Sequence, residues 1–163
     1  MDTKEIESIL KFRMKGVYVG VYASDELPQI IRRPLAIVIN TDPSDKPGTH
    51  WTALYITREG YGEFFDTRGI APDHRVRSYL NKKAPRGFEY NQRRIQSPVT
   101  TICGMYCIEF LVTRHYHPRL PFSTILRYLY PFEDPWLNDL ETYKRFQETY
   151  GEKPRPLIDV RLM

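Results

Sequence analysis

Residues 50–66 read HWTALYITREGYGEFFD and carry the clearest signal for the architecture of the chain. Two apolar runs of strand length, WTALYIT (51–57) and GEFFDT (62–67), flank the sequence REGYG, which is typical of a tight turn. The stretch therefore predicts a β-hairpin. Because the two strands of a hairpin are antiparallel, the start of the first lies beside the end of the second. We therefore expect His50 and Asp66 to be neighbours at one edge of a sheet.

Upstream of the hairpin, the sequence predicts two more strands and one helix. LAIVINTD (35–42) is a continuous apolar run, as expected for a buried central strand, and GVYVGVYAS (16–24) reads as another strand. DTKEIESILKF (2–12) predicts a helix, because capping and acidic residues at its start accompany apolar residues at helical spacing.

Downstream of the hairpin, helices predominate. CGMYCIEFLVTRHY (103–116) is apolar over most of its circumference, which predicts a buried helix. The other predicted elements are a helix over 72–83, a strand over 88–97, helices over 123–132 and 139–151, and an extended end over 152–163. We therefore expect an α+β fold in a single domain, 1–163, with a mixed central sheet flanked by helices.

Charge and cysteine content limit the classes of function. The net charge of +4 fits either a solvated surface or a weak, salt-sensitive affinity for DNA or another polyanion. The N-terminus lacks the pattern of a signal peptide, and no apolar run approaches the roughly 18 residues of a membrane span. Cys103 and Cys107 stand four apart, a poor arrangement for a disulfide within a helix. We expect a soluble, intracellular protein in a reducing compartment, with no membrane association.

Cys103 is the candidate nucleophile, because it stands where the irregular sequence SPVTTI meets the predicted buried helix. The N-terminus of a helix stabilises a thiolate, and its free N–H groups can donate to an oxyanion. Gly104 would let a substrate backbone approach closely, since it has no Cβ. Taken alone, an intracellular cysteine such as Cys103 is usually a small buried apolar residue, and Cys107 is expected to be a buried structural thiol.

His50, Asp66 and Gln96 supply the remaining parts of a thiol protease site. His50 is the candidate base, Asp66 could orient its imidazole, and Gln96, at the end of a predicted strand, could donate to the oxyanion. Each also has a purely structural alternative: a turn histidine, a turn aspartate or partner of Arg68, and a solvated strand end. His115 and His117 lack a third ligand nearby, so no metal site is expected.

In this order and spacing, the candidate residues resemble the adenovirus-type endopeptidase family (adenain). The matching elements are His50-Trp51, the sequence FFDTRG around Asp66, Gln96, and Cys103-Gly104. The resemblance implies a papain-related cysteine protease fold, like that of adenain and the ubiquitin-like-modifier proteases. It also implies that Cys103 is the nucleophile, His50 the base, Asp66 its orienter and Gln96 the oxyanion donor, with Trp51 lining the cleft.

The resemblance further implies a cysteine endopeptidase that cleaves viral precursor proteins at glycine-containing sites during virion maturation. The expected locations of the protein are the virion and the nucleus or cytoplasm of the host cell. We expect a monomer with polypeptide substrates and no cofactor. Binding of DNA or of an activating peptide stays open. The mammalian members carry a further cysteine that forms a disulfide to an activating peptide, whereas this chain has two cysteines, Cys103 and Cys107. A distant viral or virus-derived-transposon member is therefore expected.

Two alternatives remain open at the level of sequence. A protease specific for SUMO or other ubiquitin-like modifiers shares the fold and the His–Asp–Gln–Cys order, and Asp66 and the missing activation cysteine favour it. A non-catalytic binding module on a degenerate protease fold would keep the architecture without the chemistry, but the intact set of His50, Asp66, Gln96 and Cys103 argues against it.

Overall fold

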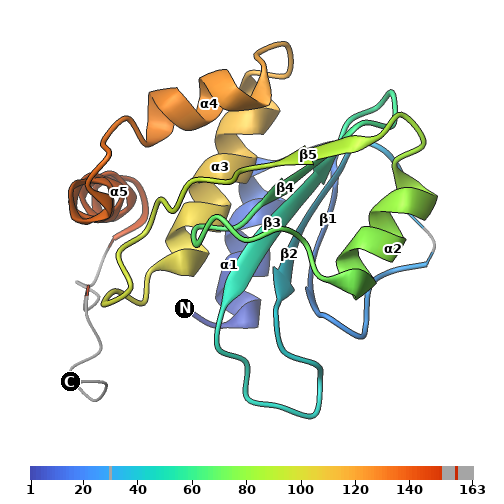
Figure 1. Ribbon diagram of the computed structural model, residues 1–163, viewed down its shortest axis with the longest axis horizontal. Helices are drawn as coiled ribbons and strands as arrows, with labels where there is room; N and C mark the ends of the chain where they lie inside the picture. The colour runs from blue at the N-terminus through green and yellow to red at the C-terminus, as the bar shows by residue number, and fades with distance from the viewer. Residues whose placement is uncertain (30, 152–156, 158–163) are drawn as a thin grey trace.

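A five-stranded mixed sheet forms the centre of the molecule in the computed structural model, which describes residues 1–29, 31–151 and 157 (Figure 1). The strands follow each other across the sheet in chain order. The pairs β1·β2 and β4·β5 are parallel, whereas β2·β3 and β3·β4 are antiparallel. The strand bounds are β1 Tyr18–Ala23, β2 Leu35–Asn40, β3 Trp51–Ile56, β4 Gly62–Phe65 and β5 Phe88–Tyr90.

The predicted hairpin is confirmed as β3 and β4. Ala53 pairs with Phe65 and Ile56 pairs with Gly62, so the strands turn through residues 57–61. Gly60 adopts a φ of 93° in that turn, a left-handed conformation that favours glycine. His50 immediately precedes β3 and Asp66 immediately follows β4, so both emerge at the same edge of the sheet.

Helices cover both faces of the sheet because its central strands are apolar on both sides. One face packs against α1 (Thr3–Arg13) and α3 (Cys103–Tyr116), and the other packs against α2 (His74–Lys83) (Figure 1). Alternate residues of β2 point in opposite directions: Ala36 and Val38 join the α1/α3 core, while Leu35, Ile37 and Ile39 join the α2 core.

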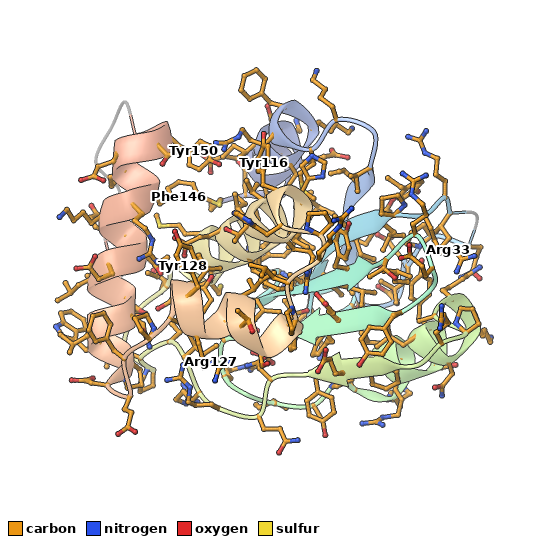
Figure 2. The ribbon with its side chains drawn as sticks, turned by 90° about the horizontal axis from the view of Figure 1, so that it is seen from above. Arg33, Tyr116, Arg127, Tyr128, Phe146 and Tyr150 are labelled. Carbon is orange, nitrogen blue, oxygen red and sulfur yellow. The ribbon has the colours of Figure 1, made fainter. Side chains whose placement is uncertain are left out.

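Two further helices, α4 (Phe122–Leu129) and α5 (Pro135–Tyr150), pack against α3. A series of aromatic rings links the sheet to this layer. Phe65 stacks on Phe110 at 4.9 Å between centroids and on Tyr130 at 5.7 Å. Figure 2 shows Phe146 and Tyr150 on the side of α5 that faces the rest of the molecule, and Phe146 belongs to the α1/α3 core.

The predicted α+β class is confirmed, and three element boundaries are corrected. The helix predicted over 123–132 ends at Leu129, where the Tyr130 N–H donates to the Leu126 carbonyl. The strand predicted over 88–97 ends at Tyr90, because the side chain of Asn91 bonds to the backbone of Asp66 and Arg93, and the chain then leaves the sheet. The helix predicted to begin at residue 139 begins at Pro135, where the Asp134 carboxylate accepts from the Trp136 N–H.

Two expectations about the whole chain have different outcomes. Apart from Leu157, the extended end predicted over 152–163 lies outside the described residues. Within the described part of the chain, no helix is both long and apolar enough to cross a membrane.

Candidate active site

A cleft of about 1280 Å³ opens where β3 begins and α3 begins. Five of the six predicted site residues line it: His50, Trp51, Gln96, Cys103 and Gly104. Asp66 lies deeper, 2% exposed, and contacts His50. The fold therefore brings together residues that are far apart in the chain: His50 and Gly104 are separated by 54 positions.

His50 and Asp66 form a buried pair at the edge of the hairpin. The His50 Nε2 atom lies 2.8 Å from the Asp66 Oδ1 atom, and the two residues are 8% and 2% exposed. The imidazole also lies close enough to the Cys103 thiol for the two groups to shift each other's pKa. The imidazole thus lies between a carboxylate and a thiol.

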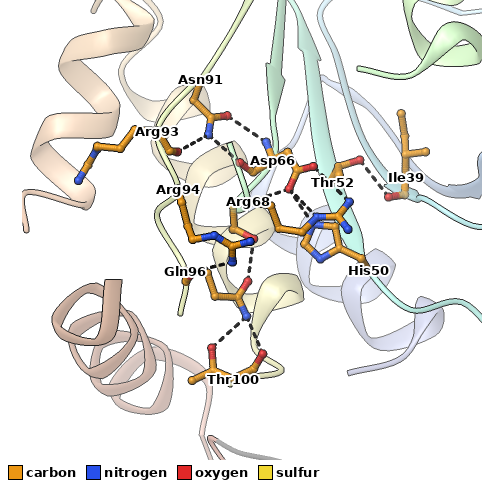
Figure 3. A network of polar contacts seen from close by, with 11 residues as sticks. Ile39, His50, Thr52, Asp66, Arg68, Asn91, Arg93, Arg94, Gln96 and Thr100 are labelled. Atoms are coloured by element: carbon orange, nitrogen blue, oxygen red, sulfur yellow. Dashed lines mark hydrogen bonds and ion pairs between the residues drawn. The ribbon is translucent and has the colours of Figure 1, made fainter. Parts of the chain in front are cut away.

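Two residues that the sequence did not single out for the site hold Asp66 in place (Figure 3). The Arg68 backbone N–H donates to Asp66 Oδ1 at 2.8 Å, and the guanidinium lies 3.4 Å from both carboxylate oxygens. The Asn91 side chain accepts from the Asp66 N–H at 3.0 Å and donates to the Asp66 carbonyl at 2.6 Å. No sequence signal pointed to Asn91, because the strand was predicted to continue to residue 97 and only the structure places Asn91 directly after β5.

Cys103 is the first residue of α3, as predicted, and is 8% exposed. Burial disfavours the charged thiolate, but the hydrogen bond and charge of His50 outweigh it. The backbone N–H groups of Trp51 and Gly104 add to this effect. The pKa of the Cys103 thiol is therefore lowered from its ordinary value.

The pKa values of His50 and Asp66 are also shifted, each in the direction that favours the charged form of the side chain. Burial lowers the pKa of His50, yet the hydrogen bonds and charges of Asp66 and Cys103 raise it above its ordinary value. Burial raises the pKa of Asp66, but His50 and Arg68 hold it below its usual range. These directions favour a thiolate–imidazolium pair backed by a carboxylate.

Gln96 lies in the cleft wall but not at a strand end, which corrects the sequence-based position. It stands in the irregular segment after β5, where the Gln96 N–H donates to the Thr67 carbonyl at 3.1 Å. Its side-chain oxygen accepts from the Thr67 hydroxyl at 2.7 Å. Its side-chain nitrogen donates to the carbonyl and hydroxyl of Thr100 at 3.0 and 3.1 Å (Figure 3). The amide is therefore held from both ends beside the cleft.

Trp51 and Gly104 both line the cleft, one on β3 and one on α3. A Cβ atom on Gly104 would lie 3.1 Å from the Met1 sulfur and 3.4 Å from the Ile6 Cδ1 atom. Close packing of α3 against the N-terminal segment is thus a structural reason for glycine at this position, besides the expected approach of a substrate backbone.

The remaining candidate residues lie apart from this cluster. Cys107 is fully buried one turn further along α3, where burial raises the pKa of its thiol well above the ordinary value. The His115 ring packs against the Tyr116 ring at 5.1 Å between centroids. Among the described residues, no group of three or more His, Cys, Asp or Glu side chains could hold a metal ion.

One curated relative and several solved structures are similar to this chain, although no protein-family model matches it. The protease of snake adenovirus serotype 1 is 31% identical in an alignment over 109 residues that covers 58% of this chain and 54% of the relative. The matched region thus spans about half the length of that relative. The resemblance to adenovirus-type proteases predicted from the sequence is confirmed by this relative together with the fold.

Similar folds occur in a viral protease and in a bacterial protein. The crystal structure of the ASFV pS273R protease has a TM-score of 0.65 at 16% identity, covering 90% of this chain and 65% of that one. ChlaDub1 from Chlamydia trachomatis has a TM-score of 0.51 at 14% identity, covering 96% of this chain and 82% of that one. At these identities the likeness concerns the fold, and it confirms the predicted papain-related α+β architecture.

Proposed function

We propose that this chain, which is related to the adenovirus-type proteases, is a cysteine endopeptidase with Cys103 as its nucleophile. The observation that carries the proposal is the position of His50 between the Asp66 carboxylate and the Cys103 thiol. A nucleophile, a base and a group that orients the base in mutual contact are the requirements of covalent acyl transfer.

In the proposed reaction, the Cys103 thiolate attacks the carbonyl carbon of the scissile peptide bond. The His50 imidazolium then gives its proton to the leaving amine, and an acyl-enzyme remains on Cys103. His50, now neutral, takes a proton from a water molecule, whose oxygen attacks the acyl carbon and releases the acid product. Asp66 keeps the imidazole oriented and stabilises its charged form throughout.

The developing oxyanion needs donors close to the Cys103 sulfur. The Gly104 N–H, in the first turn of α3, contacts the Cys103 thiol and is the first proposed donor. Gln96 is the second proposed donor. Because its side-chain nitrogen bonds to Thr100 in this structure, substrate binding must draw one of its two N–H groups toward the cleft.

The proposed substrates are polypeptides, specifically viral precursor proteins cleaved at glycine-containing sites during particle maturation. The support is the resemblance to a viral protease and an open cleft of about 1280 Å³ beside the candidate nucleophile. Trp51 and Gly104 are the proposed substrate-contacting residues. The proposed places of action are the virion and the infected cell.

Cleavage of a mixed-peptide library, with products identified by mass spectrometry, tests the activity and its specificity. We expect products after small residues from the parent protein and from Cys107→Ala, the matched control on the same helix. Cys103→Ala should stay folded and yield no products, because no other thiol lies beside His50. Turnover by Cys103→Ala would exclude the mechanism.

A second arm of the experiment uses precursors of ubiquitin-like modifiers as substrates. Cleavage of these alone would replace the viral-maturation proposal with a modifier-specific protease of the same fold. No cleavage of either class, with no acyl-enzyme on Cys103, would favour a binding module. Repeating both arms with added DNA measures whether the net charge of +4 has a role in activation.

A further inference from the structure

Asp139 is a fully buried carboxylate on α5, outside the cleft, that the proposed mechanism does not use. Within the described part of the chain, Lys, Arg and His residues form no ion pair with it. Its two oxygens instead accept three hydrogen bonds. Burying a carboxylate without a cation is costly, so these three bonds must offset the loss of water.

The three donors come from two segments that flank the nucleophile. Asp139 Oδ2 accepts from the Ser97 N–H and from the Thr100 hydroxyl, both at 3.0 Å. Asp139 Oδ1 accepts from the Tyr106 hydroxyl at 2.6 Å. Ser97 and Thr100 belong to the segment that joins Gln96 to Cys103, and Tyr106 lies one turn after Cys103. The carboxylate therefore fixes this segment relative to the start of α3.

Few backbone bonds of its own hold the 97–102 segment in shape. Pro98 has no N–H, and within the segment the Thr100 N–H reaches the Ser97 carbonyl at a long 3.4 Å. The Val99 N–H reaches the Ser97 hydroxyl at 3.5 Å. Since these contacts are long, the 3.0 Å bonds to Asp139 are the contacts that tie Ser97 and Thr100 to a helix outside the segment.

Asp139 also fixes the direction of the hydrogen bonds that reach Gln96. An ionised carboxylate only accepts, so the Thr100 hydroxyl donates to it and offers a lone pair to the Gln96 side-chain nitrogen. At the other end, the Thr67 hydroxyl donates to the Gln96 side-chain oxygen. The amide is therefore oriented with its nitrogen toward Thr100 and its oxygen toward Thr67.

We propose that Asp139 is a positioning residue, which acts through Thr100 and Ser97 to hold Gln96 and the 97–102 segment beside the cleft, so that one N–H group of Gln96 can turn from Thr100 to the oxyanion when substrate binds. This inference rests on the proposed function, because it assigns Asp139 a part in the turnover of peptides. It makes α5, a helix outside the cleft, a functional part of the site.

Kinetics of Asp139→Ala against the cleaved library peptide test the inference. We expect kcat to fall about 10- to 100-fold with little change in KM, since misplacing a group at the reacting centre costs up to that order. Alkylation of Cys103 by iodoacetamide at pH 6 should keep the parent rate, because His50 and Asp66, which activate the thiol, do not contact Asp139. A general loss of structure would slow both reactions.

Three further variants separate positioning from packing. Asp139→Asn should recover most of the lost kcat, because one amide oxygen can still accept from Ser97 and Thr100. Thr100→Val, which removes the connecting hydroxyl, should reproduce much of the loss even if Asp139→Ala fails to fold. Glu109→Ala is the matched control: this carboxylate also joins α3 to α5, through Arg145 and Thr142, but contacts no residue of the segment. It should lower stability and leave kcat near that of the parent protein.

The possible outcomes are distinct. Any one of three results would overturn the inference. The first is a parent-like kcat for Asp139→Ala. The second is a kcat loss in Asp139→Asn and Glu109→Ala as large as that in Asp139→Ala, and the third is a fall in the alkylation rate of Cys103 as large as the fall in kcat. If the parent protein itself cleaves nothing and its Cys103 is not alkylated preferentially, the proposed function fails instead. A kcat loss confined to Asp139→Ala and Thr100→Val would support the role of Asp139.

Discussion

At the scale of single residues, the chemistry depends on groups whose charges are set by their neighbours. His50 and Asp66 could be paired from the sequence because a hairpin has one register that joins its two ends. The contact of Asn91 with Asp66 and that of Asp139 with Thr100 could not be predicted in this way, since the partners are 25 and 39 positions apart in the chain. Such contacts depend on how whole elements pack, which no local pattern reports.

The pH dependence of kcat/KM tests the coupling of His50 to Asp66. The proposed thiolate–imidazolium pair requires the pKa of Cys103 to lie below that of His50. The lowered pKa of Cys103 and the raised pKa of His50 both act in that direction, so a bell-shaped profile is expected. Asp66→Asn removes the carboxylate that raises the pKa of His50, so the alkaline limb should move to lower pH. The acidic limb should move to higher pH, since a less stable imidazolium lowers the pKa of the Cys103 thiol by a smaller amount.

The matched control for the pH experiment is Asp73→Asn, which replaces the N-cap of α2 with another residue that caps helices well. Its profile should match that of the parent protein. An unchanged alkaline limb in Asp66→Asn would mean that the carboxylate does not set the protonation of His50.

At the scale of elements, the sequence located most helices and strands, and it failed where a side chain competes with the backbone. β5 ends early because Asn91 takes up backbone groups that a longer strand would have paired. The early start of α5 had a visible signal in Asp134-Pro135, a capping residue followed by proline in the first turn. β2 and β3 were predictable because their apolar runs are buried on both faces.

A buried ion pair joins β4 to α3 and gives the element-scale prediction. The Arg114 guanidinium contacts both carboxylate oxygens of Glu63, at 2.8 and 2.5 Å, and the two residues are 2% and 4% exposed. Arg114→Met should lower the free energy of unfolding by about 3–5 kcal/mol, because it leaves the Glu63 carboxylate buried without a cation. Urea denaturation followed by circular dichroism measures the change.

Two comparisons control this experiment. Glu7→Ala breaks the exposed pair with Lys11 and should change stability by less than about 1 kcal/mol. The double variant Glu63→Met with Arg114→Met should lose less than Arg114→Met alone, since no charge remains buried. A single-variant loss as small as that of Glu7→Ala would show that the pair does not hold α3 to the sheet.

At the scale of the whole molecule, the site is assembled from separate parts of the chain. His50 and Asp66 flank the β3–β4 hairpin, and Cys103 is the first residue of α3. Gln96 directly precedes the 97–102 segment, which bonds to Asp139 of α5. The sequence predicted these parts individually, but their assembly follows from the packing of α3 between the sheet and α5. This packing gives two cysteines four residues apart opposite properties: Cys103 lines the cleft beside His50, whereas Cys107 is fully buried.

The reactivities of these two thiols can be compared within one protein, without a substrate. The folded protein is treated with limiting iodoacetamide at pH 6, and mass spectrometry of its peptides gives the extent of alkylation at each cysteine. We predict fast alkylation of Cys103 and almost none of Cys107, with the Cys103 rate falling sharply in His50→Ala. Alkylation of Cys107 as fast as that of Cys103, or a Cys103 rate unaffected by His50→Ala, would contradict the claim that Cys103 is a nucleophile activated by His50.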